Sequence, residues 1–188
     1  IDDLEFAQAL ADCLLEQFED KQDGGFFFTS HDHEKLIHRN KPGYDNATPS
    51  GNGIAASALQ RLGYLTGEPR YLDAARRTLH LFHHTLQTQP SACVSLAIAL
   101  EEALKPPGVV ILRGEAGAAR QMQHALQARY RPDTLVLAFP AGLCGLPPAL
   151  DKPAPPTGAA VNAYVCLGVS CLPPVPDLGT IERLLTEV

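Results

Sequence analysis

Hydrophobic residues recur every three or four positions along most of the first hundred residues, which is the spacing of amphipathic α-helices. The first such stretch runs from about Asp2 to Phe18. The second begins between Ser50 and Gly53 and ends at Gly67, and the third begins at Pro69, where the first helical turn tolerates proline. Because only about three residues separate the second stretch from the third, the sequence predicts an antiparallel helix pair. The side chains expected to be buried on these helices are Leu4, Ala7, Ala11, Leu14, Leu15, Phe18, Ile54, Ala55, Ala58, Leu59, Leu62, Leu65, Leu72, Ala75, Leu79, Phe82 and Leu86.

A fourth helix is expected after Pro90, with Ser91 as its cap. Its run Ala92 to Leu100 is apolar all round, so we expect it to be buried on most sides. The connection between the first and second helices is far longer, roughly thirty residues against the usual two to eight of helix bundles. Within it, Phe26 to Thr29 and Leu36 to Arg39 predict the two strands of a short hairpin. Long connections of this kind often carry function, so we expect the functional end of the helices here.

The pattern changes at Pro106-Pro107-Gly108. Val109 to Leu112 and Thr134 to Phe139 are continuous apolar runs, as in strands buried on both faces. Between them, Glu115 to Arg129 has helical periodicity, with Ala119, Met122 and Leu126 turned inward. Strand, helix and strand in this length predict a βαβ unit.

Two further elements complete the pattern. Gly158 to Cys166 predicts a third strand, and Leu178 to Leu185 predicts a last helix. The fold class is therefore mainly α with a small α/β unit. Antiparallel helix hairpins are expected in residues 1–105, followed by a βαβ-containing C-terminal subdomain in residues 106–188.

Composition narrows the class of partner. The net charge of −6 disfavours a nucleic-acid partner, which usually meets a basic face. The longest uncharged stretch, Pro153 to Pro176, is interrupted by prolines and glycine, so no membrane-spanning helix is expected. Five irregularly spaced cysteines do not resemble a secreted disulfide framework, which favours a cytoplasmic location. The chain begins without Met inside a predicted helix, and we interpret it as a fragment of a larger protein.

The segment from Tyr44 to Gly53 is the strongest candidate site, because it places hydroxyl, amide and carboxylate groups at a helix start. Free backbone N–H groups there can hold an anion or a polar ligand. In a catalytic interpretation, Asp45 acts as acid or base, while Tyr44, Ser50 and Asn52 line the ligand pocket. In the structural alternative, which the sequence favours, Ser50 only caps the helix and Asp45 only fixes the loop.

Three other groups of residues have a plain structural interpretation that we prefer. His31, Asp32, His33 and Glu34 fit a solvated turn better than a metal site, and His80, His83 and His84 fit a solvated helix flank. No metal ion and no cofactor is therefore predicted. Gly114 to Gly117 lacks the glycines and lysine of nucleotide-binding loops and predicts an ordinary strand–helix turn. Cys166 and Cys171 have neither redox-motif nor zinc spacing and are expected to be structural thiols.

Three motifs together resemble a known family. They are Gly24-Gly25-Phe26-Phe27, Asp45 to Asn52, and Ala163 to Cys166 with Cys171 and Pro173-Pro174-Val175. In this order they resemble the C-terminal region of the thioredoxin-domain-containing family that includes spermatogenesis-associated protein 20 and bacterial homologues. The resemblance implies an N-terminal thioredoxin-like domain joined to an (α/α)6 toroid, similar to that of N-acylglucosamine 2-epimerases. This chain is then expected to hold the last part of the toroid and the α/β tail.

Three hypotheses of function follow. The first is a carbohydrate-binding or carbohydrate-modifying protein with a sugar ligand, in which Asp45 is the acid or base. The second is a non-catalytic module that supports the implied thioredoxin-like domain and uses Cys166 and Cys171. The third is a plain scaffold whose partners are the remaining toroid helices of the full-length chain. A piece of a helix ring exposes an apolar flank, so we also expect self-association.

Overall fold

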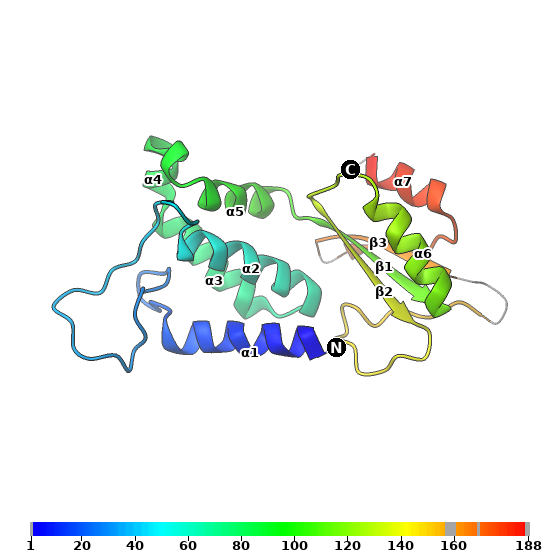
Figure 1. Ribbon diagram of the computed structural model, residues 1–188, viewed down its shortest axis with the longest axis horizontal. Helices are drawn as coiled ribbons and strands as arrows, with labels where there is room; N and C mark the ends of the chain where they lie inside the picture. The colour runs from blue at the N-terminus through cyan, green and yellow to red at the C-terminus, as the bar shows by residue number, and fades with distance from the viewer. Residues whose placement is uncertain (1, 157–160, 169, 187–188) are drawn as a thin grey trace. The chain divides into compact units, whose positions relative to one another are not determined.

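The computed structural model describes residues 2–156, 161–168 and 170–186 and divides the chain into two compact units, residues 1–105 and 106–188 (Figure 1). The first unit is helical. Its elements are α1 (Asp2–Gln17), α2 (Gly51–Thr66), α3 (Pro69–Leu81), α4 (His83–Thr88), the short 3-10 helix η1 (Pro90–Ala92) and α5 (Val94–Leu104). Within the described residues, no helix has both the length and the apolar character needed to cross a bilayer.

Helix α2 is the centre of the first unit and packs against α1, α3 and α5 (Figure 1). Ser50 caps its start and Gly67 ends it in the left-handed conformation, as the sequence predicts. Small residues let the neighbouring helices approach closely, because a Cβ on Gly53 would lie 2.1 Å from Ser95 Oγ and one on Gly63 would lie 2.7 Å from Leu72. The buried core of this unit comprises Ala11, Phe26, Ala55, Ala56, Leu59, Leu62, Tyr71, Ala74, Ala75, Leu79, Phe82, Cys93, Leu96 and Ala99.

Five predictions for this unit were wrong in detail. Ile54 and Ala58 are exposed, because the buried side of α2 is the one that carries Gly53, Ala56 and Gly63. Helix α5 begins at Val94, and Ser91 lies in η1 and does not cap it. The expectation that the run Ala92 to Leu100 is buried on most sides also fails. Val94 and Ile98 are each about half exposed.

The fourth error is the hairpin predicted between Phe26 and Arg39. Phe26 forms an isolated antiparallel bridge with Glu19, and the Phe28 N–H donates to Asn40 O at 2.8 Å. The backbone hydrogen bonds of this segment therefore go to several partners, and no ladder forms between the two halves. The third helix likewise stops at Leu81, and Phe82, whose ring lies against Gly43 of the long connection, separates it from α4.

The second unit contains the predicted βαβ arrangement. Its elements are β1 (Gly108–Gly114), α6 (Ala116–Gln127), β2 (Thr134–Pro140), β3 (Val161–Leu167), β4 (Ser170–Cys171) and α7 (Leu178–Thr186). The sheet has the order β2-β1-β3-β4, with β1 parallel to β2 and antiparallel to β3. The prediction that β2 is buried on both faces was wrong, because β2 is an edge strand and is only partly buried. The predicted third strand is present from Val161, while residues 158–160 of that prediction lie outside the described residues.

Helices α6 and α7 contribute to the hydrophobic core on one face of this sheet (Figure 1). The core comprises Val110, Leu112, Ala119, Leu126, Val161, Ala163, Val165 and Ile181. The long connection after β2 is fixed by Arg113, which is only 4% exposed at the end of β1. Its guanidinium donates to the backbone carbonyls of Pro140, Ala141, Leu143 and Lys152. A buried cation with this many acceptors holds an irregular segment in place without a regular element.

Candidate functional site

Asp45 joins the starts of two helices. Its Oδ1 accepts from Ser50 N at 2.7 Å and from Ser95 Oγ at 2.5 Å, and its Oδ2 accepts from Ser95 N at 2.8 Å. Burial acts to raise the pKa of the Asp45 carboxyl, but the hydrogen bonds from Ser95 and Ser50 outweigh it and hold the pKa below the ordinary value. Asp45 is thus an ionised acceptor with both oxygens engaged, and it links the N-terminal ends of α2 and α5.

Ser50 completes this junction. Its Oγ accepts from Gly53 N at 3.1 Å, which makes it the N-cap of α2, and it lies 3.0 Å from Ser95 Oγ. The structural alternative for Ser50 and Asp45 is therefore confirmed in its geometry. The first N–H groups of α2, on Gly51 and Asn52, have no intrahelical acceptor.

Asn52 ties the long connection to α2. It is 1% exposed, and its Oδ1 accepts from Phe26 N at 2.7 Å. Its Nδ2 donates to Phe26 O at 2.9 Å and to Pro42 O at 3.0 Å. Both N–H groups of the amide and one of the two lone pairs of Oδ1 are taken by backbone groups, so Asn52 mainly holds the long connection in place.

A cavity of about 320 Å³ lies at the start of α2, between that helix and the long connection. Three of the four predicted site residues, Tyr44, Ser50 and Asn52, line it. The remaining lining residues are Leu14, Phe26, Phe27, Phe28, Pro42, Asn46, Thr48, Pro49 and Gly51. Its wall is thus rich in aromatic rings, with a few polar groups at one side.

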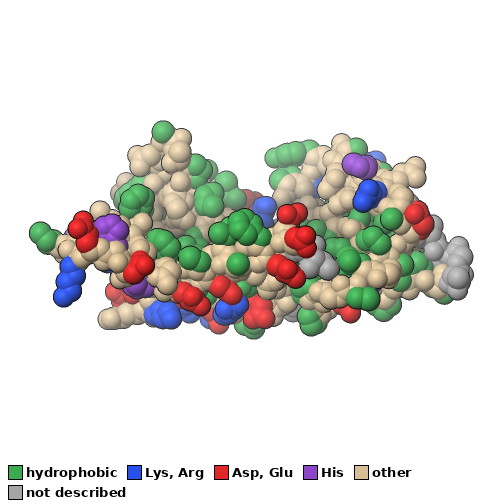
Figure 2. Space-filling view, turned by 60° about the horizontal axis from the view of Figure 1, so that its bottom comes forward, with side chains coloured by type: hydrophobic (Ala, Val, Ile, Leu, Met, Phe, Trp, Pro, Cys, Tyr) green, Lys and Arg blue, Asp and Glu red, His purple; other side chains and the backbone are tan. Residues whose placement is uncertain are grey.

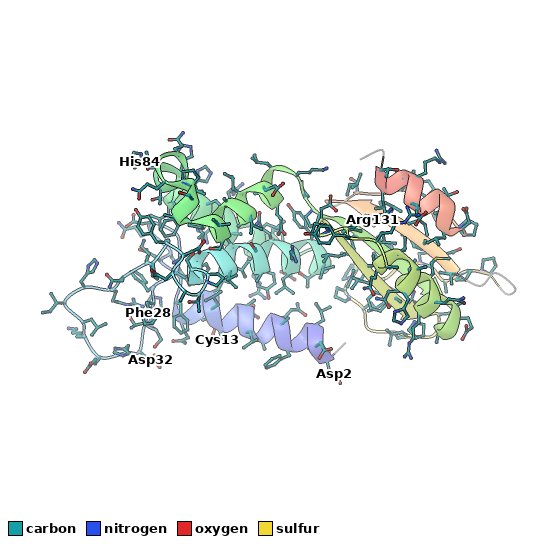
Figure 3. The ribbon with its side chains drawn as sticks, turned by 45° about the horizontal axis from the view of Figure 1, so that its top comes forward. Asp2, Cys13, Phe28, Asp32, His84 and Arg131 are labelled. Carbon is teal, nitrogen blue, oxygen red and sulfur yellow. A yellow bond between two sulfur atoms is a disulfide. The ribbon has the colours of Figure 1, made fainter. Side chains whose placement is uncertain are left out.

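The aromatic rings of the cavity differ in their freedom. Phe27 is held by cations, with the Arg39 guanidinium 4.0 Å from the ring centroid and Lys41 Nζ 5.4 Å from it. Phe28 extends from the connection that follows α1 and is 77% exposed, and Tyr44 is 48% exposed (Figure 3). These two rings are accessible to a ligand.

Asp45 does not line this cavity. It lies instead on a second groove of about 380 Å³, between α2 and α5, whose apolar wall includes Ile54, Val94 and Ile98. The sequence predicts one pocket shared by all four residues, and the structure divides them between two adjoining hollows. The role of Asp45 as acid or base stays a prediction.

Ser95 is the residue of this site that sequence reasoning missed. It is buried and contacts Asp45 through both its N–H and its hydroxyl, fifty positions along the chain. The available signal was that Ser95 is the lone hydroxyl in the apolar run from Ala92 to Leu100. A polar side chain inside such a run needs a partner when buried.

The two histidine clusters lie on the surface of the first unit. Within the ranges that the structure describes, no three His, Cys, Asp or Glu side chains are grouped to hold a metal ion. His31 Nε2 lies 3.1 Å from Glu19 O and its Nδ1 lies 3.2 Å from Arg39, so it helps to fix the long connection. His80, His83 and His84 are exposed.

The predicted strand–helix turn after β1 is confirmed. Glu115 caps α6, accepting from Gly117 N at 2.9 Å and from Ala118 N at 2.8 Å. These hydrogen bonds hold the pKa of the Glu115 carboxyl below its ordinary value. Because the protein's own carboxylate occupies these N–H groups, they are not presented to a phosphate.

The prediction of free structural thiols at Cys166 and Cys171 was wrong, because a disulfide joins them. The two residues face each other across the antiparallel pair β3–β4, which brings their Cα atoms to 3.9 Å. A tight hairpin makes this pairing across only a few intervening residues, which spacing alone did not reveal. Cys13 and Cys144 are exposed thiols and Cys93 is a buried one.

Comparison with known proteins gives one distant similarity. No protein-family model matches the chain. The chain is 26% identical over 188 residues to spermatogenesis-associated protein 20 of Homo sapiens. The match covers 97% of this chain and 24% of the human protein, so the chain spans about a quarter of that relative's length.

Proposed function

We propose that the cavity at the start of α2 binds a neutral carbohydrate. The observation that carries the proposal is the pairing of two accessible aromatic rings, Phe28 and Tyr44, with polar groups in one cavity of about 320 Å³. Small-molecule sites typically combine apolar and aromatic walls with a few polar groups that fix orientation. The apolar C–H face of a sugar ring packs on an aromatic ring, while its hydroxyls need hydrogen-bonding partners.

The polar partners are available beside the rings. The side chains of Asn46 and Thr48 line the cavity and make no hydrogen bond within the part of the chain that the structure describes. The leading N–H groups of α2, on Gly51 and Asn52, supply two further donors. A neutral polyol satisfies these groups without introducing a charge into the cavity.

The proposal assigns binding rather than turnover to this cavity. Asp45 stabilises the two helix starts, and both of its oxygens already accept hydrogen bonds. An acid or base must reach the proton it transfers, at about 2.6–3.2 Å from its partner. If Asp45 were to modify a carbohydrate, it would have to lose a hydrogen bond from Ser50 or Ser95 and form one with the substrate. The resemblance to toroidal sugar enzymes is an argument from fold, which does not fix a reaction.

Titration calorimetry with a panel of neutral mono- and disaccharides tests the binding proposal. Replacing Tyr44 or Phe28 with Ala is expected to weaken binding about fivefold, since an aromatic contact contributes about 1 kcal/mol. Ile37→Ala is the matched control, because Ile37 is fully exposed on the same connection and does not line the cavity. Absence of binding by every sugar, or equal loss in the Ile37 variant, removes the proposal.

A second candidate function is a scaffold that packs against further helices of a longer chain. Ile54, Val94 and Ile98 are about half exposed along the groove between α2 and α5. Phe6 and Leu10 of α1 are also exposed. The surface in Figure 2 shows hydrophobic side chains interspersed with acidic ones. In a protein with the length of the human relative, earlier helices of a toroid would cover such a face, and a thioredoxin-like domain would precede them.

Self-association of the 188-residue chain tests the scaffold candidate. With the covering helices absent, a second copy is expected to occupy the groove, and light scattering should give a mass that rises with concentration. The double variant Ile54→Gln, Ile98→Gln is expected to remain monomeric, while Ile37→Gln associates like the wild type. A wild-type chain that is monomeric at every concentration contradicts this candidate.

A further inference from the structure

Arg131 in the second unit carries a buried donor without an acceptor. It lies in the loop between α6 and β2 (Figure 3), where Arg131 O accepts from Thr134 N at 3.2 Å and closes a turn through Pro132. Its Nη1 is buried and makes no hydrogen bond within the described residues. An unpaired buried donor is unfavourable, and a guanidinium carries a full positive charge in addition.

The Arg131 side chain lines a cavity of about 210 Å³ between the end of α6, the start of β2 and α7. The other lining residues are Leu126, Gln127, Arg129, Tyr130, Pro132, Thr134, Val136 and Leu185. No carboxylate is among these lining residues in the described part of the chain. The cavity is smaller than the roughly 300–1,000 Å³ of sites for drug-sized ligands, so its ligand must be small.

Among the residues that the structure describes, the charges around the cavity leave Arg131 unneutralised. Arg129 also lines it, but its Nε lies 3.2 Å from Glu182 Oε1 on α7. Asp133, which lies in the same loop, accepts from the Thr134 hydroxyl at 3.3 Å and forms no ion pair with Arg131 within the described residues. The carboxyl end of α6 contributes a partial charge of about −0.5, which is smaller than the charge on Arg131.

We propose that this cavity binds a small organic carboxylate with an apolar body. The carboxylate accepts from the guanidinium of Arg131, which lines the cavity, since guanidinium and carboxylate are matched in shape and charge. Leu126, Val136 and Leu185 form the wall against which the apolar body packs. This ligand differs in class from the carbohydrate of the first unit, and the two sites belong to separate units of the chain.

Titration of the isotope-labelled 188-residue chain with sodium benzoate and sodium hexanoate, followed by amide NMR, tests the site. Both compounds are expected to give saturable shifts at Leu126, Thr134 and Leu185. Arg131→Met keeps the aliphatic stem and is expected to weaken binding at least tenfold. Arg131→Lys keeps the charge but not the planar fork, and is expected to bind with intermediate affinity.

Arg120→Met is the matched control, because Arg120 is exposed on α6 and does not line the cavity. It is expected to bind benzoate like the wild type, and inorganic phosphate at the same ionic strength is expected to give no saturable shift at these amides. The proposal is overturned if neither carboxylate saturates the wild type, if Arg131→Met binds equally well, or if phosphate binds as tightly. Should Arg131→Met fail to fold by circular dichroism, Arg131→Gln and Arg131→Lys give the same comparison.

Discussion

Replacement of Asp45 by Asn separates a structural role of this carboxylate from a chemical one. Asn has nearly the same shape as Asp, but only one of its two terminal atoms accepts a hydrogen bond. Asp45 receives backbone N–H groups on both oxygens, from Ser50 on Oδ1 and from Ser95 on Oδ2. Whichever way the new amide turns, one of these backbone donors faces an NH₂ group and loses its acceptor.

The expected loss of stability follows from those contacts. A buried donor left without a partner costs about 1–3 kcal/mol, and hydrogen bonds to a charged acceptor are roughly twice as strong as neutral ones. We therefore expect Asp45→Asn to lower the free energy of unfolding by about 3 kcal/mol in urea denaturation. Asp32→Asn is the control, because Asp32 is exposed on the same connection and accepts from Ser30 alone among side chains, so its unfolding midpoint should match the wild type.

The same carboxylate gives a pH dependence with a defined sign. The pKa of Asp45 in the folded protein lies below its ordinary value of 3.8. A lowered folded-state pKa stabilises the fold above the unfolded-state pKa, and this stabilisation is lost as the pH falls through the folded-state pKa. The stability difference between wild type and Asp45→Asn is therefore constant near neutral pH and shrinks below about pH 4. A variant as stable as the wild type, or a difference that grows on acidification, refutes this reasoning.

The remaining predictions concern other fixed points of the two units. Asn52→Ala leaves three backbone groups without a partner and should reduce stability by about 3 kcal/mol in urea denaturation; a loss under about 1 kcal/mol would contradict the role given to this amide. Gly53→Ala places a Cβ 2.1 Å from Ser95 Oγ and should lower stability by about 2 kcal/mol, whereas Gly51→Ala meets nothing within 4 Å and should not. Equal melting temperatures of these two variants would argue against the close packing of α2 on α5. Arg113→Met removes the donors that hold the connection after β2 and should reduce stability by about 3 kcal/mol, with faster hydrogen exchange in β1 and β2; unchanged exchange there would show that other contacts suffice.

The helices and the βαβ unit were predictable because their signals are local. Ser50 and Gly67 mark both ends of α2 through the chemistry of caps, which depends on a few neighbouring residues. The apolar run of β1 likewise indicated a strand buried on both faces. The run of β2 correctly indicated a strand, but β2 lies at the sheet edge and is only partly buried. In each case the residues that decide the structure lie within one turn or one strand of each other.

The long connection was not predictable, because distant residues decide it. The aromatic residues around Phe26 have the composition of a strand, so the sequence predicted a hairpin. In the structure Phe26 instead bridges to Glu19 and hydrogen-bonds to Asn52, twenty-six positions away. The Asp45–Ser95 contact spans fifty positions and has no local signature. For the same reason the sequence placed Asp45 in the pocket with Tyr44, whereas its hydrogen bonds to Ser95 turn it toward the other groove.

The claim that the cavity before α2 is a carbohydrate site is tested most directly by mapping sugar-induced amide shifts on the 188-residue chain by NMR. We expect a neutral sugar to shift Phe28, Tyr44, Thr48 and Gly51 together, with saturation requiring a higher sugar concentration in Tyr44→Ala and an unchanged one in Asp45→Asn. Shifts confined to other surfaces, or no response to any sugar at saturating concentration, would contradict the claim.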